Sequence, residues 1–199
     1  MKRIFDFTLS LIAIIILLPL FILIALLIVL TSKGGPFYLQ TRIGKGGKPF
    51  KIIKFRTMYK NSDKKGLLTV GKKDPRVTHI GYFLRKTKLD ELPQLFNILF
   101  GHMSFVGPRP ELPKYVNLYN ERQRQVLSVR PGLTDYASLE YINESEILAQ
   151  AENPEQYYIE YVMPAKLELN LKYIQDQSFT TDLIIIFKTI VRIFHTQRK

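Results

Sequence analysis

The sequence contains no cysteine, and acidic residues are scarce in it relative to basic ones. The absence of cysteine from all 199 residues excludes disulfides and thiolate-bound metal ions. Asp and Glu number 17 against 29 Lys and Arg, so the formal net charge is +12. Such an excess favours anionic partners, and nucleic acid, anionic lipid headgroups and phosphorylated small molecules all satisfy it.

Two motifs of nucleotide-using proteins are also absent. The glycine-lysine stretch at 44–48 (GKGGK) lacks the spacing of a P-loop, G-x-x-x-x-G-K-[ST]. No Asp-x-Asp occurs, which argues against a metal-dependent glycosyltransferase of that type. Internal repeats and low-complexity segments are missing too. The length and the 46% hydrophobic content therefore fit one domain, or one domain with an anchor.

The longest hydrophobic run lies near the N-terminus. Every residue from Leu11 to Leu30 is apolar, and cations lie on both sides of the run. About twenty such residues are enough for a helix to cross the hydrocarbon core of a bilayer. The run is longer than the hydrophobic region of a signal peptide and lacks a small-residue cleavage site. We therefore expect a membrane anchor over 1–32 and a second domain over 33–199.

Pro19, near the middle of this run, predicts a kink because it removes a backbone donor. A helix bent there could enter one leaflet and return, leaving both cationic ends on the cytoplasmic face. Proline is also tolerated in helices that span the bilayer. Because both flanks are cationic, the charge asymmetry that would orient a spanning helix is weak. These residues leave the re-entrant and the spanning form open.

The remaining pattern predicts an α+β fold that is mainly helical. β-Branched and aromatic residues over Phe37–Ile43 and Pro49–Phe55, on either side of the glycine-lysine turn, predict a small β-hairpin. Arg130–Gly132 reads as a turn. Further along we expect a polar loop over 61–74, a short helix within 75–88, and helical segments over 91–100, 111–126, 136–170 and 182–194.

Two of these helices have apolar faces that need a partner. Residues 91–100 place leucines and a phenylalanine on one face, and we expect that face to pack in the core, with seating on the membrane as the alternative. Residues 182–194 (DLIIIFKTIVRIF) carry Lys188 and Arg192 one turn apart. Such an amphipathic helix can lie in the membrane interface with its cations at headgroup level, or pack in the core.

Asp90 and Glu91 form an acidic pair directly after several cations. Pro93 is tolerated in the first turn of a helix, which supports Asp90 as the N-cap. The unpaired N–H groups of a helix start also bind phosphate. The stretch by itself fits either an ordinary capped helix or a site for a phosphorylated substrate.

Four motifs follow the proline-bearing anchor in order. They are Lys51–Met58 (KIIKFRTM), Leu89–Leu95 (LDELPQL) with Asn97, Met103–Pro110 (MSFVGPRP) and Arg130–Thr134 (RPGLT). Together they resemble the bacterial sugar transferase family, the monotopic phosphoglycosyl transferases that begin the assembly of cell-surface glycans. The resemblance covers nearly the whole chain, and the length is similar to that of the minimal members.

The resemblance implies an activity and a place in the cell. Members transfer a sugar 1-phosphate from a nucleotide diphosphate sugar, usually a UDP-sugar, to undecaprenyl phosphate, and release UMP. It implies a nucleophile at Asp90, which becomes a covalent phosphosugar intermediate, and a metal-associated acid at Glu91. The catalytic domain is then expected on the cytoplasmic face of the bacterial inner membrane, against anionic phospholipid and without nucleic acid. A homodimer is left open.

The chemistry explains why cations surround the acidic pair. A carboxylate attacks an anionic diphosphate only where nearby positive charge offsets the repulsion. We expect phosphate and nucleotide contacts from Arg56, Arg85, Arg109 and Arg130, because guanidinium groups bind phosphate bidentately. We expect Mg²⁺ at Asp90 and Glu91, since it prefers carboxylate and phosphate oxygens. A surface or ion-pair role remains an alternative for each arginine.

The sequence departs from the family at three places. Leu18 stands where a serine often precedes the anchor proline, which removes a hydroxyl that could stabilise the bend. Asp135 follows Leu133-Thr134 where many members have glycine, and Asn170 replaces a common aspartate. These changes leave the acidic pair intact and make the identity of the sugar the least predictable property.

A non-enzymatic alternative is a membrane-anchored basic protein that binds lipid or nucleic acid. It accounts for the net charge and the anchor. It gives no reason for the Asp90-Glu91 pair or for the Pro-Arg-Pro sequence that carries Arg109.

Overall fold

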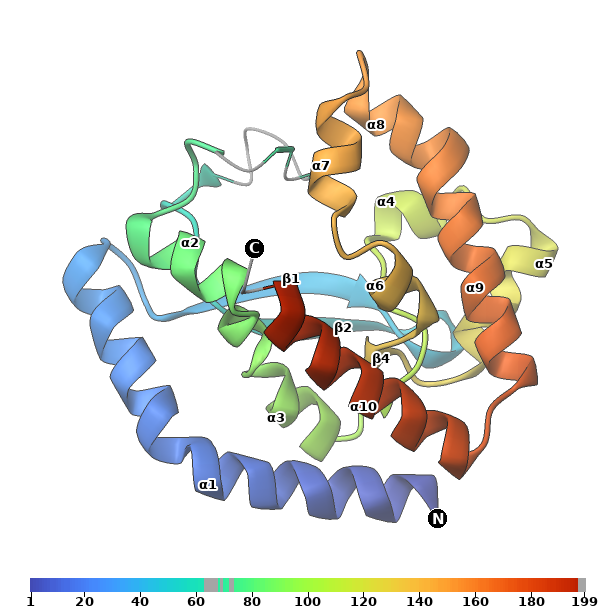
Figure 1. Cartoon of the computed structure of the whole chain (residues 1–199), viewed down its shortest axis with the longest axis horizontal. Coiled ribbons are helices and arrows are strands. Elements are labelled where there is room, and N and C mark those ends of the chain that lie inside the picture. Colours follow the sequence, from blue (N-terminus) through green and yellow to red (C-terminus); the bar gives the residue numbers. More distant parts are fainter. Residues whose placement is uncertain (63–67, 69, 72–73, 197–199) are drawn as a thin grey trace.

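The computed structural model describes residues 1–62, 68, 70–71 and 74–196, so most of the predicted polar loop lies outside the described residues. The mainly helical α+β fold is confirmed (Figure 1). The helices and strands are α1 (Lys2–Thr31), β1 (Phe37–Ile43), β2 (Pro49–Phe55), α2 (His79–Lys86), α3 (Gln94–Leu99), β3 (Ser104–Val106), α4 (Pro113–Val116), α5 (Glu121–Arg124), β4 (Gly132–Thr134), α6 (Tyr136–Glu140), α7 (Glu144–Ala149), α8 (Pro154–Tyr157), α9 (Met163–Gln175) and α10 (Phe179–Thr196).

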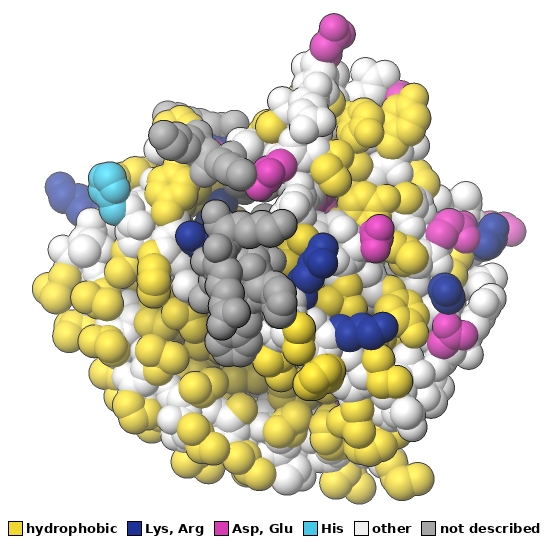
Figure 2. Space-filling view, viewed as in Figure 1, with side chains coloured by type: hydrophobic (Ala, Val, Ile, Leu, Met, Phe, Trp, Pro, Cys, Tyr) yellow, Lys and Arg dark blue, Asp and Glu magenta, His cyan; other side chains and the backbone are white. Residues whose placement is uncertain are grey.

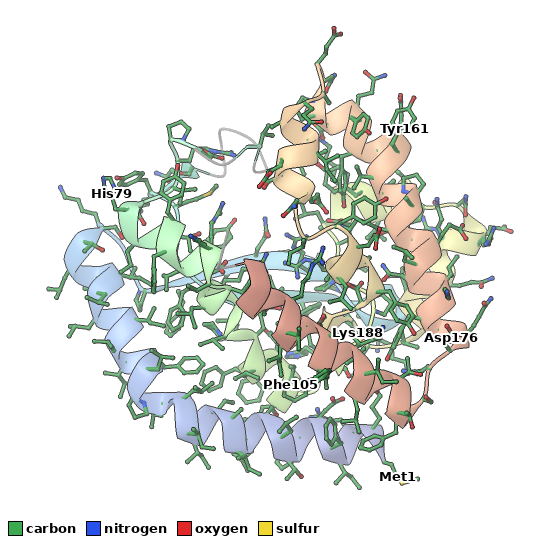
Figure 3. All side chains as sticks on the ribbon, viewed as in Figure 1. Met1, His79, Phe105, Tyr161, Asp176 and Lys188 are labelled. Carbon is green, nitrogen blue, oxygen red and sulfur yellow. The ribbon has the colours of Figure 1, made fainter. Side chains whose placement is uncertain are left out.

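The long helix α1 is bent near its middle, as Figure 1 shows, and Pro19 lies inside it. The bend follows from the missing N–H and from the clash of the proline ring with the preceding turn. Among the described residues α1 alone is long and apolar enough to cross a membrane. Many of its side chains point away from the rest of the molecule along its outer edge (Figure 3). This is the membrane-embedded helix expected from the sequence.

The N-terminal end of α1 is fixed to the folded domain by hydrogen bonds. The Lys2 ammonium donates to Asp182 on α10 (2.6 Å) and to the hydroxyl of Tyr173 on α9 (2.8 Å). The Arg3 guanidinium donates to the Ile98 and Leu99 carbonyls at the end of α3, at 2.6 and 2.7 Å. The two cations that precede the apolar run therefore have partners inside the protein.

The half of α1 after the bend packs on the same domain through apolar contacts. Ile24 and Ile28 are buried, and the Phe21 ring lies 5.6 Å from that of Phe55 on β2 and 5.7 Å from that of Phe96 on α3. The face of α3 predicted to pack in the core does so, against α1. Both ends of α1 thus contact one body, which a bent helix allows.

The predicted hairpin is confirmed with the expected bounds. β1 and β2 pair antiparallel from Phe37 opposite Phe55 to Ile43 opposite Pro49. At the tip, Gly46 and Gly47 have positive φ, a conformation that glycine adopts at little cost. The side chain of Asn97 on α3 bonds to the backbone of β2, accepting from Ile53 (2.9 Å) and donating to the Lys51 carbonyl (2.8 Å). This pair of bonds fixes α3 against the hairpin.

A second strand pair was not predicted. β3 and β4 pair in parallel, with Ser104 opposite Gly132 and Val106 opposite Thr134. The predicted turn at 130–132 is wrong at its last residue, because Gly132 begins β4. A Cβ at Gly132 would lie 2.1 Å from the Gly107 nitrogen, so the two segments approach at a distance that only glycine permits.

The predicted helix over 111–126 is also wrong. The chain forms α4, breaks, and then forms α5 and a 3₁₀ turn over Gln125–Ser128. Asn120 starts α5 with a capping box: it accepts from the Gln123 N–H (2.9 Å), and the Gln123 side chain accepts from the Asn120 N–H (3.0 Å). An N-cap residue has a non-helical backbone, so a continuous helix cannot pass through Asn120, and a new helix begins after it. Residues 136–170 are mostly helical, as predicted.

The helix at the C-terminal end has one buried and one exposed apolar face. Ile185 on α10 is 0% exposed and packs beside Val106 and Tyr173. Phe187 is 68% exposed on the other side. The buried face of α10 fits the prediction of packing in the core, and the exposed apolar face fits the prediction of a helix in the membrane interface. Figure 2 shows hydrophobic side chains gathered over the α1 and α10 side of the molecule, with acidic ones towards α7, α8 and α9.

Candidate active site

Asp90 and Glu91 lie in a single 3₁₀ turn, Leu89–Glu91, between α2 and α3. The prediction that Asp90 is the N-cap of a helix over 91–100 is wrong, because α3 begins after Pro93. Pro93 has no N–H to bond the Leu89 carbonyl, and the Leu92 N–H bonds it instead (3.2 Å), which tightens the turn. Lys88, in the left-handed conformation, precedes it. The acidic pair still lies at the entrance to a helix.

Glu91 is clamped by two cations from distant parts of the chain. The Lys54 ammonium, from β2, lies 2.8 Å from Oε1. The Arg109 guanidinium, from the loop after β3, donates to Oε1 (2.5 Å) and Oε2 (3.3 Å). Burial alone would raise the pKa of Glu91, but the charges of Arg109 and Lys54 outweigh it and hold the pKa well below its usual value. Glu91 is therefore a persistent carboxylate.

Asp90 has a different environment although it is the adjacent residue. Its side chain is nearly enclosed, with 8% of the residue exposed. Burial raises the pKa of Asp90 above its usual value, and the negative charge of Glu91 adds to this rise, while Lys54, Lys88 and Arg85 oppose it. Two titratable groups whose environments separate their pKa values are typical of catalytic sites.

Arg85 reaches the pair from the last turn of α2. Its Nε donates to the hydroxyl of Thr57 (2.9 Å), a buried residue just after β2. Burial lowers the pKa of Arg85, and the charge of Asp90 opposes that change. Of the four predicted arginines, the structure thus brings Arg109 into contact with the acidic pair, and it places Arg85 near enough for its charge to act on Asp90.

The other two predicted arginines are bonded elsewhere. Arg56 donates to the Phe37 carbonyl (3.2 Å), and a Cβ at Gly34 would lie 1.8 Å from its Nη1. Arg130 donates to the Gly101 carbonyl (2.9 Å) just after α3. Within the described part of the chain, neither donates to Asp90 or Glu91. Their roles in binding a phosphate or nucleotide stay predictions.

Lys54 is a site residue that the sequence reasoning missed. It lies in the KIIKFRTM motif, which by itself does not distinguish it from Lys51. Lys54 follows the buried Ile52 by two positions on β2, and such residues share one face of a strand. Burial lowers the pKa of Lys54, and the charge of Glu91 opposes that change. A lysine on the buried face of a strand requires a nearby anion, and this signal could have identified it.

The donor atoms fit a magnesium ion that is shared with a substrate. Asp90 and Glu91 offer hard carboxylate oxygens, which suit Mg²⁺. No group of three or more His, Cys, Asp or Glu residues arranged to hold a metal occurs among the described residues. The set therefore fits an ion held by one or two carboxylates together with phosphate oxygens, rather than an all-protein cage.

Comparisons with known proteins identify the family of the chain. A family model described as bacterial sugar transferase matches residues 1–196. The chain is 48% identical over 118 residues, 59% of its length, to a putative undecaprenyl-phosphate N-acetylgalactosaminyl 1-phosphate transferase of Bacillus subtilis, of which it covers 66%. Over 98% of its length it is 36% identical to the UDP-glucose:undecaprenyl-phosphate glucose-1-phosphate transferase of Escherichia coli, of which it covers 40%.

A further relative is matched over nearly its whole length. The chain is 38% identical to the exopolysaccharide production protein PSS of Rhizobium leguminosarum bv. phaseoli, over 96% of this chain and 94% of that protein. The chain thus spans less than half of the Escherichia coli relative and almost all of this one. The chain belongs to the bacterial sugar transferase family.

Proposed function

We propose that the protein transfers a sugar 1-phosphate from a UDP-sugar to undecaprenyl phosphate and releases UMP. The observation that carries the proposal is the contrast within the acidic pair: Glu91 is clamped by Lys54 and Arg109, while Asp90 is a buried carboxylate with a raised pKa. The Escherichia coli and Bacillus subtilis relatives are named as undecaprenyl-phosphate sugar-1-phosphate transferases, the latter as a putative one, and these names support the proposal.

The reaction takes place in two displacements at one phosphorus atom. An Asp90 carboxylate oxygen attacks the phosphate next to the sugar, the bond to UMP breaks, and a phosphosugar remains on Asp90. An oxygen of the lipid phosphate then attacks the same phosphorus, and the bond to Asp90 breaks. A carboxylate with a raised pKa is a stronger nucleophile than an ordinary one, provided that nearby cations keep it ionised.

The surrounding cations reduce the repulsion between Asp90 and the diphosphate. Lys54, Lys88 and Arg85 all favour the ionised form of Asp90, and they approach it from β2, the 3₁₀ turn and α2. Such fixed charges stabilise the negative charge that develops on the transferred group. Glu91 and Asp90 would hold Mg²⁺, which when bound would supply further neutralisation at the diphosphate.

The proposal includes a re-entrant anchor over residues 1–32 and a catalytic domain over 33–199 on the cytoplasmic face of the inner membrane. The contacts of both ends of α1 with one body support it, since a straight spanning helix would place its two ends on opposite sides of the bilayer. Anionic phospholipid would then contact the basic protein. A homodimer remains a prediction.

The covalent step can be tested without a lipid acceptor. The purified protein is incubated with Mg²⁺ and each of a panel of UDP-sugars, and the peptide containing Asp90 is weighed by mass spectrometry. We expect a phosphosugar adduct with one or a few donors, and none with Asp90→Asn. The exposed Asp176→Asn provides a matched control that should label normally.

Two results would contradict parts of the proposal. UMP that appears on addition of lipid, without any labelling of Asp90, would exclude the covalent step. UDP in place of UMP would identify a glycosyl transferase. The non-enzymatic alternative predicts no nucleotide release by the wild type with any donor, together with membrane binding that Asp90→Asn leaves unchanged.

A further inference from the structure

Asp135 is a fully buried carboxylate that the proposed reaction does not use. It is 0% exposed and lies between β4 and α6. Its Oδ1 accepts from the Ser138 N–H (2.6 Å) and thereby caps α6. Its Oδ2 accepts from the main-chain N–H of Arg109 (3.1 Å). One side chain therefore joins the start of a helix to the residue whose guanidinium clamps Glu91.

A helix cap alone does not require this residue. Ser, Thr and Asn cap helices with a single oxygen about as well as Asp does. A carboxylate held away from water is unfavourable unless both oxygens are hydrogen-bonded or a cation lies near. Here the second oxygen accepts from the Arg109 N–H, and the negative charge of Asp135 favours the cationic form of the Arg109 guanidinium. The second oxygen thus has a role that the cap does not explain.

No neighbouring N–H can take the place of the Arg109 N–H in this bond. Arg109 stands between Pro108 and Pro110, neither of which has an N–H. Its own N–H is consequently the only backbone donor between Gly107 and Glu111. The bond to Asp135 is the one by which a main-chain donor can fix the segment at the point where the guanidinium departs.

The loop on either side of Arg109 is bonded as well. The Gly107 N–H donates to the Thr134 carbonyl (3.1 Å), and the Gly132 N–H donates to the Pro108 carbonyl (3.0 Å). After Arg109, the Pro110 carbonyl accepts from the Arg42 guanidinium (3.2 Å) and the Glu111 carbonyl accepts from the Ile43 N–H (3.0 Å). The bond to Asp135 is the one made by Arg109 itself. The bidentate contact of the Arg109 guanidinium with Glu91 tolerates little displacement of the Arg109 main chain. Two N–H groups of the guanidinium must meet the two carboxylate oxygens at the same time.

We propose that Asp135 is a positioning residue, which holds the Arg109 main chain so that the guanidinium lies across Glu91. This inference rests on the proposed function for its kinetic consequence, and on the hydrogen bonds alone for its structural one. Displacing a charge-stabilising group by about 1 Å can lower the rate as much as 100-fold.

Asp135→Ser separates the two roles of the side chain. Serine is a good N-cap, but it has one oxygen, no charge and a shorter reach. We expect hydrogen exchange of the Arg109 amide to become at least tenfold faster, as followed by NMR on ¹⁵N-arginine-labelled protein. With the UDP-sugar that labels Asp90, kcat should fall about tenfold and KM change less than threefold. Asn153→Ser, a cap-for-cap change at α8 where Asn153 accepts from the Gln156 N–H (3.2 Å), is the matched control.

A second pair of variants tests whether Asp135 acts through Arg109. In an Arg109→Ala background, adding Asp135→Ser should lower the residual rate no further, because the group to be positioned is gone. Multiplicative losses would overturn the proposal, and so would an Arg109 amide whose exchange is unchanged in Asp135→Ser. The exchange measurement needs no turnover. If the wild type formed no product, the proposed function would be contradicted. The exchange measurement would still test whether Asp135 holds the Arg109 main chain.

Discussion

Lys54 is the residue on which the environments of Asp90 and Glu91 both depend. Its ammonium lies 2.8 Å from Glu91 and is also the cation that most strongly opposes the raised pKa of Asp90. Lysine rather than arginine suits this place, because a compact charge can serve two neighbouring carboxylates. The long-range pairing could not be predicted from the sequence, since Lys54 and Glu91 lie on separate elements that only the packing of α3 on β2 brings together.

Replacing Lys54 by methionine should reduce turnover by about 100-fold, the usual effect of removing one charge-stabilising group from such a site. Methionine keeps most of the apolar stem, so the strand should remain packed. The measurement is release of UMP with donor and lipid acceptor. Lys51→Met is the matched control on the same strand, because Lys51 is exposed and its ammonium donates to the Thr41 hydroxyl across the hairpin (2.7 Å). Equal losses in both variants would contradict the assignment.

Asp74 provides a pH-dependent contribution to stability away from the site. Its carboxylate accepts from Arg76 Nε (2.9 Å) and Nη2 (2.6 Å), and the bonds from Arg76 hold the pKa of Asp74 below its usual value. A lowered pKa in the folded state stabilises the protein at pH values above the unfolded pKa, and that contribution is lost as the pH falls through the folded pKa.

Asp74→Asn should therefore lower the free energy of unfolding by about 1 kcal/mol at pH 7, with the difference from wild type lost at an acidic pH below the lowered pKa of Asp74. Unfolding in detergent at both pH values measures this. The exposed Asp176→Asn should show no such difference at either pH. A deficit for Asp74→Asn that persists at the acidic pH would mean that packing, and not the charge, is responsible.

At the scale of elements, the sequence predicts those features that depend on interactions within a single segment. The hairpin bounds and the bend at Pro19 follow from β-branched residues, glycines and a missing donor, all within one segment. The pairing of β3 with β4 could not be predicted. Each strand has only three residues, too few for alternation to be visible, and their contact depends on glycines 25 positions apart, Gly107 and Gly132. The spacing of Asp90 and Pro93 predicts a cap at Asp90, but the helix starts only after Pro93.

The anchor α1 is the element whose placement has the clearest external test. The hydrogen bonds from Lys2 to Tyr173 and Asp182 hold the N-terminus beside α10. Figure 3 shows the Met1 end of the chain there. A re-entrant helix therefore predicts that residues before and after it face the same compartment. Because the chain has no cysteine, single cysteines can be introduced without background labelling.

A cysteine inserted directly after Met1 and, separately, Lys33→Cys should both react with a membrane-impermeant maleimide in inverted inner-membrane vesicles. Neither should react in intact spheroplasts. Labelling of one site from each side would indicate a spanning helix. Asp176→Cys, in the exposed α9–α10 connection, serves as the control for the face of the catalytic domain.

For the molecule as a whole, the exposed apolar surface lies where the proposed function would need a membrane. Exposed hydrophobic residues run along α1 and along the outer face of α10, while acidic side chains collect on the opposite part (Figure 2). On α10, Lys188 lies next to Phe187 in the sequence, as expected of a helix at the headgroup boundary. We expect α1 to provide most of the membrane affinity and α10 to set the height of the site above the lipid phosphate.

Phe187→Glu tests this division of roles, because it places a charge at the acyl boundary without changing the buried face of α10. Formation of the phosphosugar on Asp90 from the soluble donor should change less than about twofold, while transfer to undecaprenyl phosphate should fall about tenfold, equivalent to about 1.4 kcal/mol. Tyr161→Glu is the matched control. Tyr161 is 61% exposed and lies well apart from Lys188, towards the upper right in Figure 3, so neither step should change. If both steps fall together in Phe187→Glu, the helix supports the fold of the site and not its approach to the lipid. If only the second falls, the outer face of α10 is the surface that brings the acceptor phosphate to Asp90.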